Sequence, residues 1–300
     1  MDRRRLLGPL NTVIPNIGIS SEINGSKSTP QTGISSSSSS NKNDIENFFL
    51  KTGIIENANG SAYLEVGNNV IEVSVFGPRP IRGSFIDRAS FSVECKFLPY
   101  ISQPGDELFN TNNQFNNSNS NTNANGRTGL TTIEHKISSY VETALLPSII
   151  LEKYPKSTFD VFVTIVATET PTYNSNEKLM RLTNWIVNCA SVALVDANVE
   201  VKDIVTSGIV KSNKSGDIII DPRGQIEDEQ NEQDEQDDQN EENVLGVASF
   251  MNLNNDQLVG IWVEGGDIDQ DLVTKVINGC NDMSKKIRAN INSFLIDSLQ

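Results

Sequence analysis

The chain has 300 residues, a formal net charge of −15 and only 6% aromatic residues. Residues 225–243 hold ten acidic residues and no basic ones, so they supply −10 of that charge and leave −5 for the rest. A nearly neutral remainder can still present a local basic patch, so the overall charge does not exclude RNA as a partner.

The cysteine and hydropathy patterns argue against a disulfide-rich protein, a membrane-spanning helix and a signal peptide. Cys95, Cys189 and Cys280 are scattered and form no CxxC pair, so we expect no disulfide framework, buried thiols at Cys189 and Cys280, and a reducing compartment. No run of 18 apolar residues occurs, which argues against a membrane-spanning helix. Pro9, Asn11 and Pro15 interrupt the N-terminal apolar residues, so we expect no signal peptide.

Low-complexity segments set the expected domain boundaries. Residues 20–47 are rich in Ser, Asn and Gly, residues 110–126 in Asn, Ser and Thr, and residues 225–243 in acidic residues and Gln. Such segments bury too little apolar surface to offset the entropy of ordering. We expect an N-terminal arm and low-complexity segment over residues 1–47. One domain should span 48–300, with disordered inserts near 104–126 and 225–243.

The N-terminal arm carries Arg3, Arg4 and Arg5. Two interpretations stay open: a floppy basic terminus, or an arm that docks on a neighbouring subunit or touches RNA phosphate.

The region from Gly53 to Ser84 organises the expected fold. Alternating β-branched residues predict strands at Ser61–Val66 and Asn69–Phe76, joined by a turn at Gly67-Asn68-Asn69. The two prolines of Gly77-Pro78-Arg79-Pro80 should end the second strand. Arg79 and Arg82 would then lie together on a rigid turn.

The later periodicity predicts an α+β fold, a mixed β-sheet flanked by helices. Pro147 should kink or break the first helix, and Ile149–Leu151 could resume it. Thr131 or Thr132 could cap this helix at its N-terminus. Asp267 or Asp269 could cap the long C-terminal helix. The expected elements are strands at Ala89–Leu98, Phe159–Ala167, Val199–Val205, Val244–Met251 and Gln257–Val263, helices at Thr131–Lys153 and Lys178–Ala197, and a long C-terminal helix.

The residues alone predict no catalytic or metal site and no cofactor. The single histidine, His135, should be an exposed helix residue. One histidine and dispersed cysteines cannot form a His-based metal site or a Ser–His triad. The sequence has no Walker loop, GxGxxG or HExxH motif. We expect Trp185 and Trp262 to be core or interface anchors.

Four stretches together resemble the RNase PH superfamily, and in particular a ring subunit of the eukaryotic RNA exosome. NGSA, two strands and GPR at residues 59–79 are similar to its opening hairpin. The N-terminal DRRRLLGP, YPKS at Tyr154–Ser157 and ASVALVDANVEV at Ala190–Val201 agree in order and spacing. The resemblance implies an RNase PH-like fold, which is also ribosomal S5 domain 2-like.

Active members of this superfamily are phosphorolytic, and the resemblance implies that this chain is not. Their phosphate is held by a Gly-Thr-Arg segment at a helix N-terminus, with an acidic Asp on the preceding strand. Counting back from Asp196 places that segment at Arg181-Leu182-Thr183, where the glycine is missing and the arginine is out of register. The acid is also missing from the segment that leads to Glu169. Each loss would cost orders of magnitude in rate.

The resemblance thus implies a non-catalytic structural subunit of the exosome that supports 3′–5′ RNA processing and degradation. It would sit in a heterohexameric ring of RNase PH-like subunits, line part of the RNA channel and bind an S1/KH-type cap subunit. It would occur in the nucleus and nucleolus and also in the cytoplasm. Arg79 and Arg82 are the candidate RNA-binding residues. In the alternative interpretation neither arginine binds RNA: one forms a surface ion pair and the other is solvated.

Two other functions stay open as alternatives. One is an active phosphorolytic 3′–5′ exoribonuclease with a divergent site. The other is a small-molecule kinase on an S5-like fold, which would need a Gly-rich phosphate loop that the sequence lacks.

Overall fold

The computed structural model describes residues 45–83, 85–101, 130–168, 175–212, 218–222, 244–252, 256–266 and 270–298. All of these belong to one unit that spans residues 40–300. The inserts predicted near 104–126 and 225–243, and the first 44 residues, lie outside the described residues. The strands are β1 (Phe48–Thr52), β2 (Gly60–Val66), β3 (Asn69–Pro80), β4 (Ser90–Phe97), β5 (Ser157–Ala167), β6 (Thr206–Ser212), β7 (Ile218–Ile220), β8 (Val244–Met251) and β9 (Gln257–Glu264), and the helices are α1 (Thr132–Leu145), α2 (Ser175–Asp196) and α3 (Gln270–Ser298), with 3₁₀ turns η2 (Leu146–Ser148) and η3 (Leu151–Lys153).

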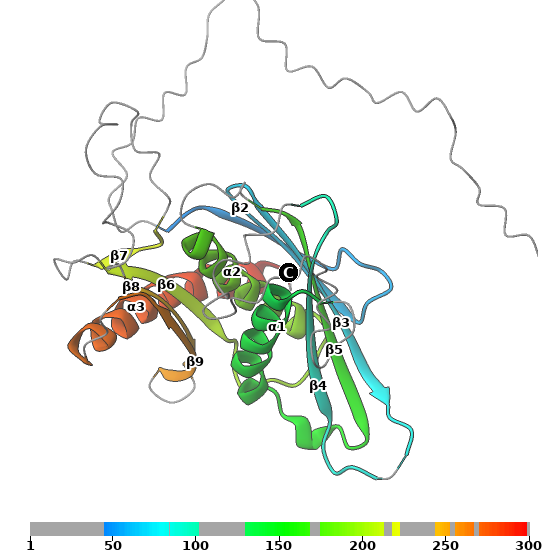
Figure 1. Cartoon of the computed structure of the whole chain (residues 1–300). Coiled ribbons are helices and arrows are strands. Elements are labelled where there is room, and N and C mark those ends of the chain that lie inside the picture. Colours follow the sequence, from blue (N-terminus) through cyan, green and yellow to red (C-terminus); the bar gives the residue numbers. More distant parts are fainter. Residues whose placement is uncertain are drawn as a thin grey trace, which may run out of the picture. The chain divides into compact units, whose positions relative to one another are not determined.

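The elements form four layers. A five-stranded sheet in the order β1-β2-β3-β5-β4 packs on α1 and α2, as Figure 1 shows. The other side of these helices faces a four-stranded sheet in the order β7-β6-β8-β9, and α3 covers the far side of that sheet. Helix α2 lies between the two sheets, which explains why its residues are buried on every side from Met180 to Leu194.

The five-stranded sheet is mixed, because β4 pairs parallel to β5 while its other pairs are antiparallel. Its strands alternate between buried and partly exposed residues, as a sheet covered on one face requires. The face toward the helices is lined by the branched and aromatic residues Ile71, Val73, Val75, Val93, Phe159, Val161, Val163 and Ile165.

The four-stranded sheet needs a glycine where α3 approaches it. A Cβ atom on Gly208 of β6 would lie 2.2 Å from the carbonyl oxygen of Cys280 in α3. Only a residue without a side chain fits at this distance. The close approach lets Val276, Cys280 and Met283 pack directly on the sheet.

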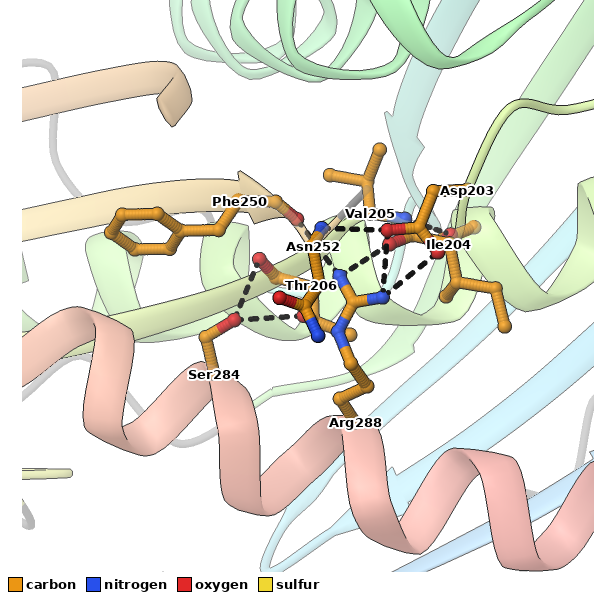
Figure 2. A network of polar contacts seen from close by, with 9 residues as sticks. Asp203, Ile204, Val205, Thr206, Phe250, Asn252, Ser284 and Arg288 are labelled. Atoms are coloured by element: carbon orange, nitrogen blue, oxygen red, sulfur yellow. Dashed lines mark hydrogen bonds and ion pairs between the residues drawn. The ribbon is translucent and has the colours of Figure 1, made fainter. Parts of the chain in front are cut away.

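A polar network fixes α3 to the ends of β6 and β8 (Figure 2). The Nη1 atom of Arg288 donates to both carboxylate oxygens of Asp203, at 3.0 and 2.9 Å. Its Nη2 atom donates to the carbonyls of Ile204 and Phe250, at 2.6 and 3.2 Å. About one turn earlier, the hydroxyl of Ser284 donates to the carbonyl of Thr206, at 3.2 Å. Charge-assisted bonds of this kind are stronger than neutral ones, so the network holds the helix in register.

The α+β class is confirmed, with the difference that the strands form two sheets rather than one. Helix α1 begins with a capping box in which Thr131 is the N-cap and Glu134 reaches back to its amide. The helix ends before Pro147, as predicted, but Ile149–Leu151 does not resume it and only 3₁₀ turns follow. The two candidate caps of α3 lie outside the described residues.

Two strand predictions are wrong. Strand β3 continues to Pro80 instead of ending at Gly77, because a register shift after Phe76 lets Arg79 pair with Thr158. The amide of Gly77 is meanwhile satisfied by Asn59 Oδ1 at 3.0 Å.

Val199–Val205 was predicted to be a strand and is not one. The amide of Val199 bonds to Leu194 at the end of α2, and the amide of Val205 bonds to Ser191 Oγ at 2.9 Å. Only Val201 forms an isolated bridge, with Ile149. Side chains and helix carbonyls of α2 therefore take the place of a strand ladder. Strands β1, β6 and β7 were not predicted.

Candidate functional site

The loop between β3 and β4 is held firmly at both ends. The amide of Ile81 donates to the carbonyl of Lys156 at 3.0 Å, and the amide of Lys156 donates to the carbonyl of Ile86 at 2.9 Å. Near β4, the amide of Ala89 donates to the carbonyl of Leu151 at 3.0 Å. Because both ends bond to the segment before β5, the loop projects from a fixed base.

The loop carries two arginines, one aspartate, Asp87, and an exposed apolar pair. Arg82 and Arg88 are exposed. Between them, Phe85 is 74% exposed and Ile86 is 41% exposed. Guanidinium groups bind phosphates, and an exposed aromatic ring can stack on a base of a single strand. The loop therefore has the chemistry of a sequence-tolerant RNA contact.

Arg79 lies apart from this loop, on the last part of β3. Its Nη2 atom pairs with Asp160 Oδ2 at 2.5 Å, and its guanidinium lies 5.6 Å from the centre of the Phe76 ring. Asp160 also accepts from Ser92 Oγ at 2.7 Å. The structure thus does not bring Arg79 and Arg82 together on one turn. Arg79 forms the surface ion pair that the sequence analysis left open as its alternative.

The segment Arg181-Leu182-Thr183 lies within α2 and not at its N-terminus. The helix begins at Ser175, so the amides of these residues come after the first turn, whose N–H groups are free. Thr183 is fully buried, and its hydroxyl donates to the carbonyl of Leu179 at 2.8 Å. A phosphate bound at a helix N-terminus needs the free amides of the first turn, and this segment does not supply them.

The guanidinium of Arg181 is buried and neutralised. Its Nε atom donates to Asp221 Oδ1 at 3.1 Å, and its Nη2 atom pairs with Glu46. The side chains of Arg181 and Asp221 are 5% and 0% exposed. The amide of Glu46 donates to Asp221 Oδ2 at 2.9 Å, which ties the two carboxylates together. This cluster joins the entry of β1, helix α2 and the end of β7.

Two of the motifs that carry the resemblance, NGSA and the segment at Ala190–Val201, contact each other. The amide of Ser61 donates to Asp196 Oδ2 at 2.8 Å. A Cβ on Gly60 would lie 2.1 Å from the amide nitrogen of Ala197, so the NGSA turn and the end of α2 meet backbone to backbone. These contacts pack the turn before β2 against the end of α2.

The other candidate residues are structural. His135 is exposed, as predicted, and Trp185 is fully buried, while Trp262 is half-buried with its ring 5.7 Å from that of Tyr140. The three cysteines are buried, and burial raises the pKa of Cys280 to about 12. In the described part of the chain, no three His, Cys, Asp or Glu side chains gather as metal ligands. No described helix is long and apolar enough to cross a membrane.

Of the exposed loop residues, Arg82 was predicted from the sequence, whereas Phe85 and Arg88 were not. Neither residue stands in a periodic pattern. The only available signal was the loop composition itself, in which arginines flank an apolar pair between two strands.

The chain is similar to known proteins of one family. A model described as "3′ exoribonuclease family, domain 1", the RNase PH model, matches residues 44–200, more than half of the chain. Among curated proteins, the exosome complex component Rrp41 of Pyrococcus horikoshii is 27% identical over 187 residues. That match covers 60% of this chain and 61% of the archaeal protein, so this chain spans less than two thirds of that relative.

Two fungal proteins are also similar. The exosome complex component MTR3 of Chaetomium thermophilum is 27% identical over 74% of this chain and 76% of its own length. The mtr3 protein of Schizosaccharomyces pombe is 33% identical over 56% and 55%. Among solved structures, rice Rrp46 superposes with a TM-score of 0.61 at 17% identity, over 85% of this chain and 97% of the rice chain. At that identity the superposition shows a common fold.

Proposed function

The chain belongs to the RNase PH family of 3′ exoribonucleases, and from that premise we propose that it is a non-catalytic structural subunit of an RNA exosome, of the MTR3 type. Its role would be to complete a heterohexameric ring of RNase PH-like subunits and to support 3′–5′ RNA processing and degradation. The two fungal MTR3 relatives support the MTR3 type, and the similar archaeal Rrp41 proteins support membership of an exosome.

One observation carries the non-catalytic part of the proposal. Arg181, the arginine of the segment where the phosphate site was expected, is buried against two carboxylates inside a helix. An incoming phosphate would have to displace Asp221 and Glu46 and would meet their negative charge instead of free amides. Loss of preorganised donors costs a factor of roughly 10² to 10³ in rate for each donor removed.

The alternative is an active phosphorolytic exoribonuclease with a divergent site. It would require another arginine and another set of free amides to bind phosphate. Within the residues that the structure describes, the exposed arginines are Arg79, which pairs with Asp160, and Arg82 and Arg88, which lie in the β3–β4 loop and not on α2. We therefore assign the two loop arginines to RNA contact rather than to phosphate activation.

The phosphorolysis test uses the full chain, alone and in the complex purified from cells. A 3′-labelled RNA is incubated with and without inorganic phosphate, and an active RNase PH-type enzyme is run in parallel. We expect no phosphate-dependent release of nucleoside diphosphate from this chain. Release that depends on phosphate and disappears in Arg181→Met would overturn the proposal.

The proposed RNA contact is the β3–β4 loop at the channel. Arg82 would bind a phosphate without reading a base, and Phe85 would stack on one. Arg79, already paired with Asp160, could contribute only by exchanging that partner. The remaining partners would be the other ring subunits and an S1/KH-type cap subunit, with the complex in the nucleus, the nucleolus and the cytoplasm.

Charge reversal tests this contact. In the purified complex, Arg82→Glu should weaken ultraviolet crosslinking of this chain to single-stranded RNA, and the salt dependence of binding should fall by about one phosphate contact. Lys275→Glu, on the exposed side of α3, is the matched control and should leave both unchanged. Equal effects of the two variants would show that the β3–β4 loop does not contact RNA.

A further inference from the structure

The five-stranded sheet has a second face that no described helix or strand covers. Helices α1 and α2 cover one face of the sheet (Figure 1). The opposite face carries an aromatic side chain on each of four strands. Phe49 of β1 is 55% exposed, and its ring lies 6.4 Å from that of Tyr63 on β2. Phe76 of β3 and Phe162 of β5 form a second pair, with ring centres 5.7 Å apart.

One end of this face already binds an arginine. The guanidinium of Arg79 lies 5.6 Å from the centre of the Phe76 ring and pairs with Asp160 on the neighbouring strand at 2.5 Å. The recognition unit is an aromatic ring and a carboxylate side by side on adjacent strands, which hold the cation from two directions.

The same unit occurs a second time on this face, without a cation. Tyr63 stands directly across from Glu72 of β3, and Glu65 is the next residue on the same face of β2. In the described part of the chain, no Lys or Arg forms an ion pair with Glu65 or Glu72, and Lys51, across from Tyr63 on β1, pairs with neither. Burial raises the pKa of the Tyr63 phenol, and the charge of Glu65, a hydrogen bond with Glu65 and the charge of Glu72 raise it further.

We propose that Tyr63, Glu65 and Glu72 form a receptor for an arginine side chain presented by another protein chain. Arginine fits better than lysine, because its planar group stacks on a ring and pairs with carboxylates at the same time. RNA does not fit, because two carboxylates repel phosphate. Phe49 and the Phe76–Phe162 pair would supply the apolar contacts on either side. This surface is separate from the β3–β4 loop, and the inference goes beyond the proposed function.

A site-specific crosslink tests the occupant. The full chain, with a benzoylphenylalanine photocrosslinker in place of Phe49, is expressed in cells and irradiated in its native complex. The same photocrosslinker in place of Ile296, which is 60% exposed on α3, serves as the control position. We expect the Phe49 position to capture an arginine-containing peptide of a different protein chain, which the control does not capture. Capture of RNA, or of this chain's own segment at Arg3–Arg5, would overturn the inference.

Two variants then test the carboxylates themselves. In Glu65→Gln/Glu72→Gln, the shape is retained and the charge is lost, so the crosslink from Phe49 should fall by about tenfold or more. Glu94→Gln on the same face is the matched control, because Glu94 already pairs with Lys96 at 2.5 Å. It should leave the crosslink unchanged. An undiminished crosslink in the double variant would show that the carboxylates bind no arginine.

Discussion

Replacing Arg288 with methionine tests the network that fixes α3 to the four-stranded sheet. The change keeps the length of the aliphatic stem and removes four hydrogen bonds, two to Asp203 and one each to the carbonyls of Ile204 and Phe250. Removing one partner of a buried ion pair costs about 3–5 kcal/mol. Asp203 keeps the amide of Asn252 at 2.6 Å and its side chain is 20% exposed, so water can compensate in part.

We therefore expect Arg288→Met to lower the free energy of unfolding by about 2–3 kcal/mol, measured by urea denaturation of the full chain. Lys285→Met, three residues earlier on the same helix, is the control. Its partner is Asp256 and its side chain is 52% exposed, so its loss should cost under about 1 kcal/mol.

A double-mutant cycle separates the ion pair from general damage. Arg288→Met with Asp203→Asn should cost less than the sum of the two single changes, by about 1–3 kcal/mol. Additive single effects, or an Arg288→Met variant as stable as the Lys285→Met control, would refute the role given to this network.

Four further predictions concern packing and burial. Gly60→Ala should cost about 1–3 kcal/mol in urea denaturation, because its Cβ would meet the Ala197 amide at 2.1 Å. Burial raises the pKa of Cys280 to about 12, so its contribution to stability should be full below the ordinary thiol pKa of about 8.5 and be lost as pH rises from there. The three thiols should resist alkylation at pH 8 until urea unfolds the chain. Among the described residues, neither side-chain amide atom of buried Asn184 has a hydrogen-bond partner. Asn184→Leu should therefore stabilise the fold by about 1 kcal/mol, and a loss of stability would indicate bound water.

Local patterns were sufficient where one residue's environment depends on its near neighbours. The β2–β3 hairpin follows from alternation and from Gly67, whose φ of 55° suits the turn. The start of α1 follows from Thr131 and Glu134, three residues apart. Such features need no knowledge of the rest of the fold.

The remaining features depend on contacts between distant segments. Arg181 meets Glu46, 135 residues away, and Asp221, 40 residues away, so its neutral burial could not be derived from its own helix. Strand β6 was missed because it is buried on both sides and shows no alternation. Gly208 interrupts the strand pattern of β6, because α3 packs too closely there for a side chain, and α3 comes much later in the chain. Val199–Val205 was misassigned because Ser191 and Leu194 satisfy its amides.

In the candidate site, too, some features follow from local sequence and others depend on contacts between distant segments. Arg82 was identified because it follows a strand and two prolines, but the exposure of Phe85 becomes evident only when the loop is seen bonded to Lys156 at its base. Arg79 was grouped with Arg82 because the strand was expected to end early. The register shift that extends β3 moves Arg79 onto the sheet face beside Asp160.

The central claim is that this chain is a structural ring subunit, and the mass of its native complex tests that claim most directly. The full chain is tagged in cells, purified under mild conditions and analysed by native mass spectrometry with identification of the subunits. The account predicts one copy of this chain together with five other RNase PH-like subunits and cap proteins. A free monomer, or a hexamer of this chain alone, would contradict it.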